Sequence, residues 1–339
     1  MPDENKNNRW LAIDIPHISE PFGTVQINRA RLFIFDREGH LSENILNSGI
    51  EEKRSYIRLL FETKIKSGEY SFVLVTNEQN LENAAQNKLN NFDGTKRQLL
   101  RKILMSRSLL TGSSLQYMAH WGASDPYMID IESSATAHNA ITLKQPLSLQ
   151  WICARVEVTV TNQLPDGSDF ITPESAGYKI RALRRIDIRN TSSLFPVATS
   201  NNNQQVISQE VTLNGQGMTG TNATGHKFTF TDQFYAGDYS DGKDFSSGEI
   251  DNTNPQRRTS AAYFIQLENT EGKTFDYIIP IGDPLWDAEK KLIGTKMERN
   301  VSYKINIFIK GSRVKQPGTC SYICPPLTRS SHNTIEIEL

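Results

Sequence analysis

The three cysteines are the residues whose spacing bears most directly on chemistry. Cys320 and Cys324 stand in the segment GTCSYICPP, with three residues between them. Outside a reducing compartment this spacing allows a small disulfide loop, and it equally allows two free thiols. A structural zinc ion takes about four ligands, whereas the nearest histidine, His332, stands alone. A disulfide, two free thiols and, last, a metal site therefore remain open. Cys153, in an apolar run beside Trp151, is expected to be a buried thiol.

His120 and Trp121, in the segment YMAHWGASDPY, are the most site-like pair of side chains. Aromatic side chains with a polar tip can line a sugar-binding cleft, so these two residues form the candidate ligand patch. The alternative is that they pack in the core or under a loop. The sequence has no P-loop, no H-E-x-x-H and no G-x-S-x-G motif, and no two of its six histidines have metal-ligand spacing. We therefore predict neither an enzyme nor a resident cofactor or metal.

The composition excludes some classes of protein. The 339 residues are enough for two domains of ordinary size. With 37 basic and 38 acidic residues the formal net charge is -1. Domains that bind nucleic-acid phosphates usually carry an excess of basic residues, so this balance argues against a nucleic-acid-binding protein. The first ten residues, MPDENKNNRW, lack the apolar core of a secretory signal. They are typical of a polar linker left after an export signal is removed, so the missing signal does not indicate the cytoplasm.

Alternating side chains indicate that most of the chain forms β-strands. In RWLAIDIPHI, Leu11, Ile13 and Ile15 share one face and a proline ends the run. In ARLFIF, Leu32 and Ile34 alternate with Phe33 and Phe35. GEYSFVLVTN carries apolar side chains on both faces, so we expect this strand to be covered on both sides. The region from about 81 to 110 is predicted to be helical, because TKRQLLRKIL has the spacing of a capping box followed by an amphipathic stripe.

A second series of strands begins near residue 146. LSLQWICARVEVTVTN and ERNVSYKINIFIKG alternate apolar and polar residues along their length. Many short strands with few helices are typical of β-sandwiches. We therefore predict a mostly β protein of two tandem antiparallel β-sandwich domains. The first spans 1–145 with a short helical insertion at 81–110, and the second spans 146–339 and includes a C-terminal tail.

The two ends of the chain have complementary strand patterns. The last six residues, TIEIEL, place Ile335, Ile337 and Leu339 on one face. Such a strand can pair within its own domain, or it can leave along the loose segment before it and complete a neighbouring molecule by β-strand addition. Without the WLAIDI strand, the sheet beside it would show an apolar trench with unpaired backbone groups. Three buried apolar side chains would contribute about 5–9 kcal/mol gross to such a joint.

The order of the strand segments resembles a known family. INRARLFIFDREGHL, IKSGEYSFVLVTN, LKQPLSLQWICARVEVTVTN, ALRRIDIRNTSSLFP and MERNVSYKINIFIKG, in this order, are similar to the fimbrillins of Bacteroides-type bacteria. These are the type V pilins and their anchor and accessory relatives. The resemblance covers most of the chain, from Leu11 to Gly311. It implies two tandem transthyretin-like β-sandwich domains, export as a lipoprotein precursor, and assembly into fimbriae at the cell surface and outer membrane.

The resemblance also implies how subunits join. In such pilins an arginine-specific protease removes the first strand, here the one in RWLAIDIP, and a neighbour's C-terminal strand, here TIEIEL, replaces it by donor-strand exchange. Two features depart from this pattern. The loop SEPFGTVQ contains no Arg or Lys, so the candidate cleavage sites are Arg9, before the strand, and Arg29, inside the next strand. The lipobox cysteine is also missing, as expected for a sequence that starts after it.

We therefore expect a structural subunit of fimbriae that supports adhesion and biofilm formation. Its partners would be other fimbrial subunits, and it would meet the membrane only through a lipoprotein N-terminus that is removed. The alternative is a surface-anchored, tip or anchor protein that acts as an adhesin for proteins or glycans of host or bacterial surfaces. Its ligand site would lie near His120 and Trp121 or in the loops at 191–260. A hydrolase with a dispersed site is the third possibility. No nucleic-acid partner is expected.

Overall fold

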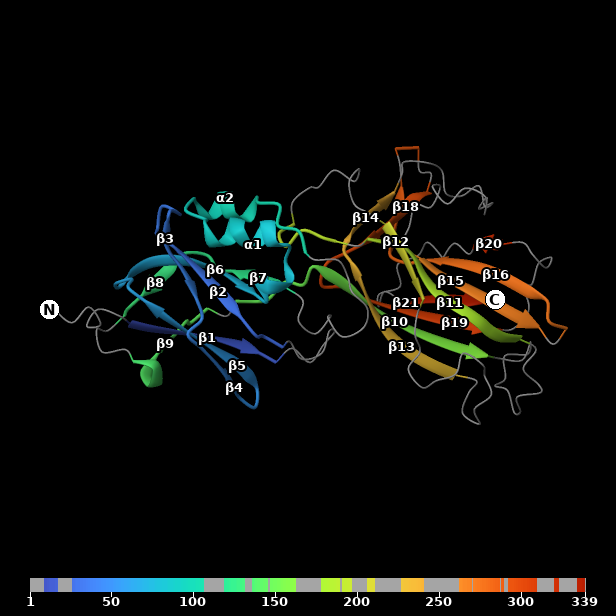
Figure 1. Cartoon of the computed structure of the whole chain (residues 1–339), viewed down its shortest axis with the longest axis horizontal. Coiled ribbons are helices and arrows are strands. Elements are labelled where there is room, and N and C mark those ends of the chain that lie inside the picture. The colour runs from blue at the N-terminus through green and yellow to red at the C-terminus, as the bar shows by residue number, and fades with distance from the viewer. Residues whose placement is uncertain are drawn as a thin grey trace. The chain divides into compact units, whose positions relative to one another are not determined.

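The computed structural model describes most of the predicted strands (Figure 1). The described residues are 9–17, 26–106, 119–131, 136–145, 147–162, 178–189, 191–196, 206–210, 227–240, 262–269, 271–286, 288–289, 292–309, 320–322 and 334–338. By its internal contacts the chain divides into two compact units. The first unit comprises Met1–Ile152 with Thr191–Ser200, and the second comprises Cys153–Asn190 with Asn201–Leu339.

The first unit contains two sheets and a few short helices. Its strands are β1 (Arg9–Pro16), β2 (Ala30–Phe35), β3 (Leu41–Leu46), β4 (Gly49–Glu52), β5 (Tyr56–Thr63), β6 (Gly68–Thr76), β7 (His120–Ala123), β8 (Tyr127–Ile129) and β9 (Ile141–Thr142). Its helices are η2 (Glu78–Asn80), α1 (Asn83–Asn90), α2 (Lys96–Leu100) and η4 (Ala137–Asn139). One sheet has the order β4-β5-β1-β9 and the other the order β3-β2-β6-β7, with β8 also paired to β6.

Strand β2 is covered on both of its faces, and β6, for which this was predicted, is buried from Ser71 to Thr76. Every residue of β2 is buried. On one face, the ring of Phe33 meets Phe92, which follows α1, edge to face at 5.8 Å. Helices α1 and α2 lie over this sheet in Figure 1. An apolar strand of this kind needs cover on both sides, because its side chains alternate between the two faces of the sheet.

The helical region is shorter than the sequence predicts. The capping box of Thr95 and Gln98 is formed as predicted, but α2 ends at Leu100. Instead of continuing the helix, the chain turns and runs beside 192–194, where Leu194 donates its backbone N–H to the Leu104 carbonyl at 2.7 Å. Pairing with a distant segment has therefore overridden the local helical preference. The rest of the predicted helical range, 107–110, lies outside the described residues.

The second unit contains three sheets. Its strands are β10 (Cys153–Asn162), β11 (Tyr178–Arg189), β12 (Val206–Glu210), β13 (Lys227–Tyr235), β14 (Gly237–Ser240), β15 (Ala262–Asn269), β16 (Thr274–Pro280), β17 (Asp283–Trp286), β18 (Leu292–Met297), β19 (Ser302–Ile309), β20 (Cys320–Tyr322) and β21 (Thr334–Glu338). The sheet orders are β13-β10-β19-β21, β12-β11-β15-β16-β20 and β14-β18-β17.

The core of the second unit follows the predicted alternation. Apolar residues of β10, β15, β16 and β19 pack in one buried cluster, with alternate residues such as Val156 and Val158 of β10 and Ile305 and Ile307 of β19 inside it. Cys153 is buried, as predicted, and burial raises the pKa of its thiol. The fold is thus mostly β, with several sheets and few helices. Among the described residues, no helix has the length and apolarity needed to cross a membrane.

Candidate subunit interface

Strand β1 lies inside its sheet, with a hydrogen-bonded neighbour on each side. It runs antiparallel to β5, with Leu11, Ile13 and Ile15 opposite Phe61, Leu59 and Ile57. On its other side it pairs in parallel with β9 through Leu11 and Ala12. We call the space that β1 fills between β5 and β9 the β1 slot. An internal strand of this kind cannot leave without exposing two rows of backbone groups.

The apolar face of β1 is part of the core of the first unit. Leu11 is 0% exposed, and Ile13 and Ile15 are each 1% exposed. The prediction that these three residues share one buried face is confirmed. At roughly 1.5–3 kcal/mol for each side chain, they contribute about 5–9 kcal/mol gross to the stability of the unit. Removal of β1 from its slot would therefore strongly destabilise the first unit.

The other face of β1 carries an ion pair with β5. The Arg58 guanidinium donates through Nε and Nη2 to the two carboxylate oxygens of Asp14, both at 2.8 Å. The hydrogen bonds that Arg58 donates to Asp14 are the main cause of the raised pKa of Arg58. Arg58 also lies over the ring of Tyr56, 5.5 Å from its centroid. The pair is thus a two-point, charge-assisted hydrogen bond between β5 and β1.

Both ends of β1 are fastened to neighbouring backbone. Arg9 donates through Nη1 to the Ile65 carbonyl at 2.7 Å. At the other end, His17 donates its backbone N–H to the Ser55 carbonyl at 3.0 Å. The β1 strand is thus paired with β5 along its whole length and held at both ends.

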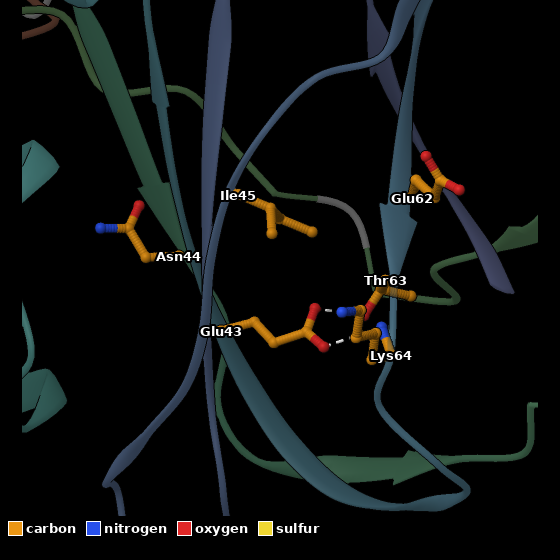
Figure 2. Close-up of a pocket in the computed structure, with 6 residues that line it drawn as sticks. All are labelled: Glu43, Asn44, Ile45, Glu62, Thr63 and Lys64. Carbon is orange, nitrogen blue, oxygen red and sulfur yellow. Dashed lines mark hydrogen bonds between the residues drawn. The ribbon is translucent and has the colours of Figure 1, made fainter. Parts of the chain in front are cut away.

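An open pocket of about 380 Å³ lies between β3 and the end of β5 (Figure 2). Glu43 reaches across it from β3 and accepts hydrogen bonds from Thr63 Oγ1 at 2.6 Å and from the Lys64 backbone N–H at 2.7 Å. The pocket is lined by Glu43, Asn44, Ile45, Glu62, Thr63 and Lys64. Glu43 therefore fastens β5, one wall of the β1 slot, to the other sheet through contacts that do not involve β1.

The two candidate cleavage sites differ in what a cut would release. Arg9 is the first residue of β1, so a cut after it leaves β1 joined to β2. Arg29 directly precedes β2, so a cut after it separates the two strands. The predicted loop SEPFGTVQ lies, except for its last residue, outside the described residues.

Arg29 is partly exposed and tethered. Its Nε lies 3.2 Å from Glu78 Oε1, and its side chain is 42% exposed. Its carbonyl accepts the backbone N–H of Asn77 at 2.7 Å. The Asn77 side chain in turn bonds the Gln26 carbonyl at 2.7 Å and the Asn28 N–H at 2.9 Å. A protease would have to open these contacts to reach the bond. Sequence reasoning missed Asn77 and Glu78, because their partners lie about fifty positions away.

The C-terminal strand β21 is paired within its own chain. It runs parallel to β19, with Ile335 opposite Ile305 and Ile337 opposite Ile307. It lies at the edge of its sheet and has one strand neighbour, whereas β1 has two. Leu339 and Cys324 lie outside the described residues, so the predicted disulfide stays a prediction. Among the described residues, no group of three or more His, Cys, Asp or Glu is placed to hold a metal ion.

The two residues of the candidate ligand patch are packed against other aromatic rings. His120 is fully buried, with Nδ1 at 3.2 Å from Thr76 Oγ1 and its ring 4.2 Å from that of Trp151. Trp121 is half-buried and packs edge to face on Phe195 at 5.3 Å. In this conformation His120 offers no surface to a ligand, and a ligand patch at these residues stays a prediction.

Burial of His120 makes the stability of the first unit depend on pH. Burial lowers its pKa to about 3, whereas an unfolded histidine titrates at about 6.5. The first unit therefore has its full stability above about pH 6.5 and loses stability as the pH falls from there toward 3. The loss reaches about 2 kcal/mol by pH 5. We expect hydrogen exchange and denaturant unfolding at pH 7 and pH 5 to show this loss in the wild type and not in His120→Gln. Equal pH dependence in both proteins would contradict the assignment.

The fold places the chain in a structural class. No protein-family model matches the sequence, and no curated protein sequence matches it significantly. Solved structures do match over most of the chain, among them fimbrial and cell adhesion proteins of Bacteroidales bacteria. The predicted resemblance is thus confirmed at the level of the fold.

Three of these structures illustrate the likeness. The tip fimbrial protein Mfa3 from Porphyromonas gingivalis is 12% identical, with 88% of this chain and 94% of that chain covered and a TM-score of 0.54. A candidate cell adhesion protein from Bacteroides eggerthii is 13% identical, with 98% of both chains covered and a TM-score of 0.52. Another from Parabacteroides distasonis is 11% identical, with 98% of both chains covered and a TM-score of 0.50.

Proposed function

We propose that this chain is a structural subunit of cell-surface fimbriae that polymerises by donor-strand exchange. In this proposal β1 leaves its slot, and the C-terminal strand of a neighbouring subunit enters with Ile335, Ile337 and Leu339 on its apolar face. The observation that carries the proposal is the position of β1. It is the first described strand of the chain, and yet it is an internal strand of its sheet whose apolar face, Leu11, Ile13 and Ile15, is buried. Only a strand of the same apolar pattern could take its place without loss of the core.

The finer parts of the proposal follow from the resemblance. The two units are tandem transthyretin-like domains, and the protein is exported as a lipoprotein precursor to the outer membrane and cell surface. There it joins other fimbrial subunits and contributes to adhesion and biofilm formation. The pairing of β21 with β19 is the resting arrangement of the tail before assembly. Exchange then moves the tail from an edge with one strand neighbour to a slot with two.

Processing is assigned to the bond after Arg29, since a cut after Arg9 leaves β1 attached. We expect an arginine-specific protease to convert the full chain to a polymer, measured by size-exclusion chromatography and electron microscopy, with the cut site read by mass spectrometry. Arg29→Gln should stay monomeric, while Arg9→Gln should polymerise like the wild type. A chain without 333–339 should be cut and stay monomeric. A cut chain that has lost β1, keeps its tail and still does not polymerise would overturn the proposal.

An adhesin at the fimbrial tip or anchor is the second candidate. It is favoured by the lack of Arg and Lys in SEPFGTVQ, since an uncleaved subunit could end a fibre but not extend it, and by the likeness to a tip fimbrial protein. A glycan array and a panel of surface proteins, probed with the intact monomer, would distinguish this role. Specific binding together with resistance to cleavage at Arg29 would favour the adhesin over the shaft subunit.

A further inference from the structure

The β1 slot contains a charge as well as an apolar trench. Arg58 projects from β5 on the face opposite to Leu11 and Ile13, and its side chain and that of Asp14 are each 27% exposed. It is held from its own strand by the ring of Tyr56, 5.5 Å from the guanidinium carbon, a contact that does not involve β1. Its Nη2 also lies 3.5 Å from Thr142 Oγ1 of β9, on the far side of β1. When β1 leaves, Arg58 therefore stays in the slot and loses the carboxylate that accepted two of its hydrogen bonds.

The neighbouring strand does not offer an obvious substitute for Asp14. Glu51 of β4 lies opposite Arg58 in the strand register. Its carboxylate, however, is 2.8 Å from the Lys53 ammonium, and the pKa of Glu51 is lowered chiefly by Lys53. Leaving a partly buried guanidinium without its hydrogen-bonded partner is unfavourable. An incoming strand that brings its own carboxylate to the place of Asp14 would restore the pair.

The C-terminal strand meets this condition in either of two registers. Its sequence TIEIEL repeats an apolar–Glu–apolar unit, and β1 has the unit Ile13-Asp14-Ile15. If Ile335 and Ile337 take the places of Ile13 and Ile15, Glu336 falls opposite Arg58. If Ile337 and Leu339 take those places, Glu338 falls there instead. Period-two alternation makes this outcome unavoidable once the apolar residues face the core.

We propose that Arg58 selects the strand that enters the slot, by pairing with a glutamate of the C-terminal strand of a second copy of this chain. This inference rests on the proposed function and adds a determinant of partner choice to it. Strands with the right apolar face but a neutral or basic residue opposite Arg58 are rejected. Charge complementarity in a largely desolvated joint discriminates between partners more strongly than it adds affinity.

The test is a binding measurement with the tail supplied as a peptide. The acceptor is the chain without 333–339, cut after Arg29 and freed of its first strand. The ligand is the peptide of residues 328–339, followed by fluorescence anisotropy. We expect Glu336→Lys/Glu338→Lys to weaken binding about 100-fold, as like charges then meet in the joint. Arg58→Glu in the acceptor should weaken the wild-type peptide similarly and restore the doubly substituted one.

The controls separate this inference from the function on which it rests. Arg54→Glu makes the same charge change at an exposed position outside the slot and should leave the affinity unchanged. If the wild-type peptide does not bind, the proposed function fails. If it binds, and the doubly substituted peptide binds equally well or is not rescued by Arg58→Glu, selection by Arg58 alone is refuted. Single substitutions at Glu336 and Glu338 then assign the register.

Discussion

Replacing Glu78 with alanine is expected to lower the free energy of unfolding of the first unit by about 3–5 kcal/mol. Glu78 is buried and accepts two hydrogen bonds from Arg31, at 2.5 Å from Nε and 2.9 Å from Nη2. Arg31 is itself buried, and among the described residues its other side-chain hydrogen bonds go to the neutral amide oxygens of Asn44 and Asn90. Without Glu78 a buried guanidinium is left without its counter-charge, which is far more costly than the pair is stabilising.

Denaturant unfolding combined with hydrogen exchange of β2 and β6 would measure this loss in the full chain. Glu82→Ala is the matched control, since Glu82 is exposed and its side chain makes no capping hydrogen bond; its cost should stay within about 0.5 kcal/mol. Arg31→Met/Glu78→Leu should recover most of the stability, because an apolar pair can replace a buried ion pair. A loss below about 1 kcal/mol for Glu78→Ala would contradict this account.

Ile13→Ala is expected to destabilise the unprocessed chain but not the assembled fibre. In the unprocessed chain Ile13 is 1% exposed within an internal strand, so its truncation should cost about 2–5 kcal/mol. In a fibre built by the proposed strand exchange β1 would have been replaced, so the same substitution should have no effect on fibre stability. Denaturant titration of the monomer and of fibres grown from the same variant would measure the two effects.

Leu59→Ala is the control for this comparison. Leu59 is opposite Ile13 in the register and is equally buried, but it belongs to β5, which stays with its own subunit. It should destabilise both the monomer and the fibre by about 2–5 kcal/mol. If Ile13→Ala destabilised the fibre as much as Leu59→Ala does, β1 would still be in its slot, and strand exchange would be wrong.

The sequence predicted the strands well because side-chain alternation is a local signal. The buried faces of β1, β2, β10 and β19 all follow from period-two patterns. The helical region was overestimated, because the pairing of 104–106 with 192–194 depends on a segment almost ninety residues away. Local propensity carries no information about such a partner.

The site was predictable only in part, for a related reason. That Leu11, Ile13 and Ile15 share a buried face is visible in the sequence. That Asp14 meets Arg58 depends on the register between β1 and β5, and that Arg31 meets Glu78 depends on how α1 and η2 pack on the sheet. Because charged residues are mostly solvent-exposed, a single sequence predicts exposure for them and does not reveal buried ion pairs of this kind.

The resting place of the tail on β19 affects how a molecule behaves before and after it joins a fibre. While β21 is paired with β19, the backbone hydrogen-bonding groups along this edge of β19 are occupied, so an isolated molecule does not expose that edge to other chains. In the proposed exchange, a subunit that donates its tail to a neighbour exposes this edge of β19 at the same time. Amides along β19 should therefore exchange with deuterium faster in fibres than in monomers, while those of β5 stay protected. Conditions that suppress pairing between exposed β19 edges should keep fibres from bundling.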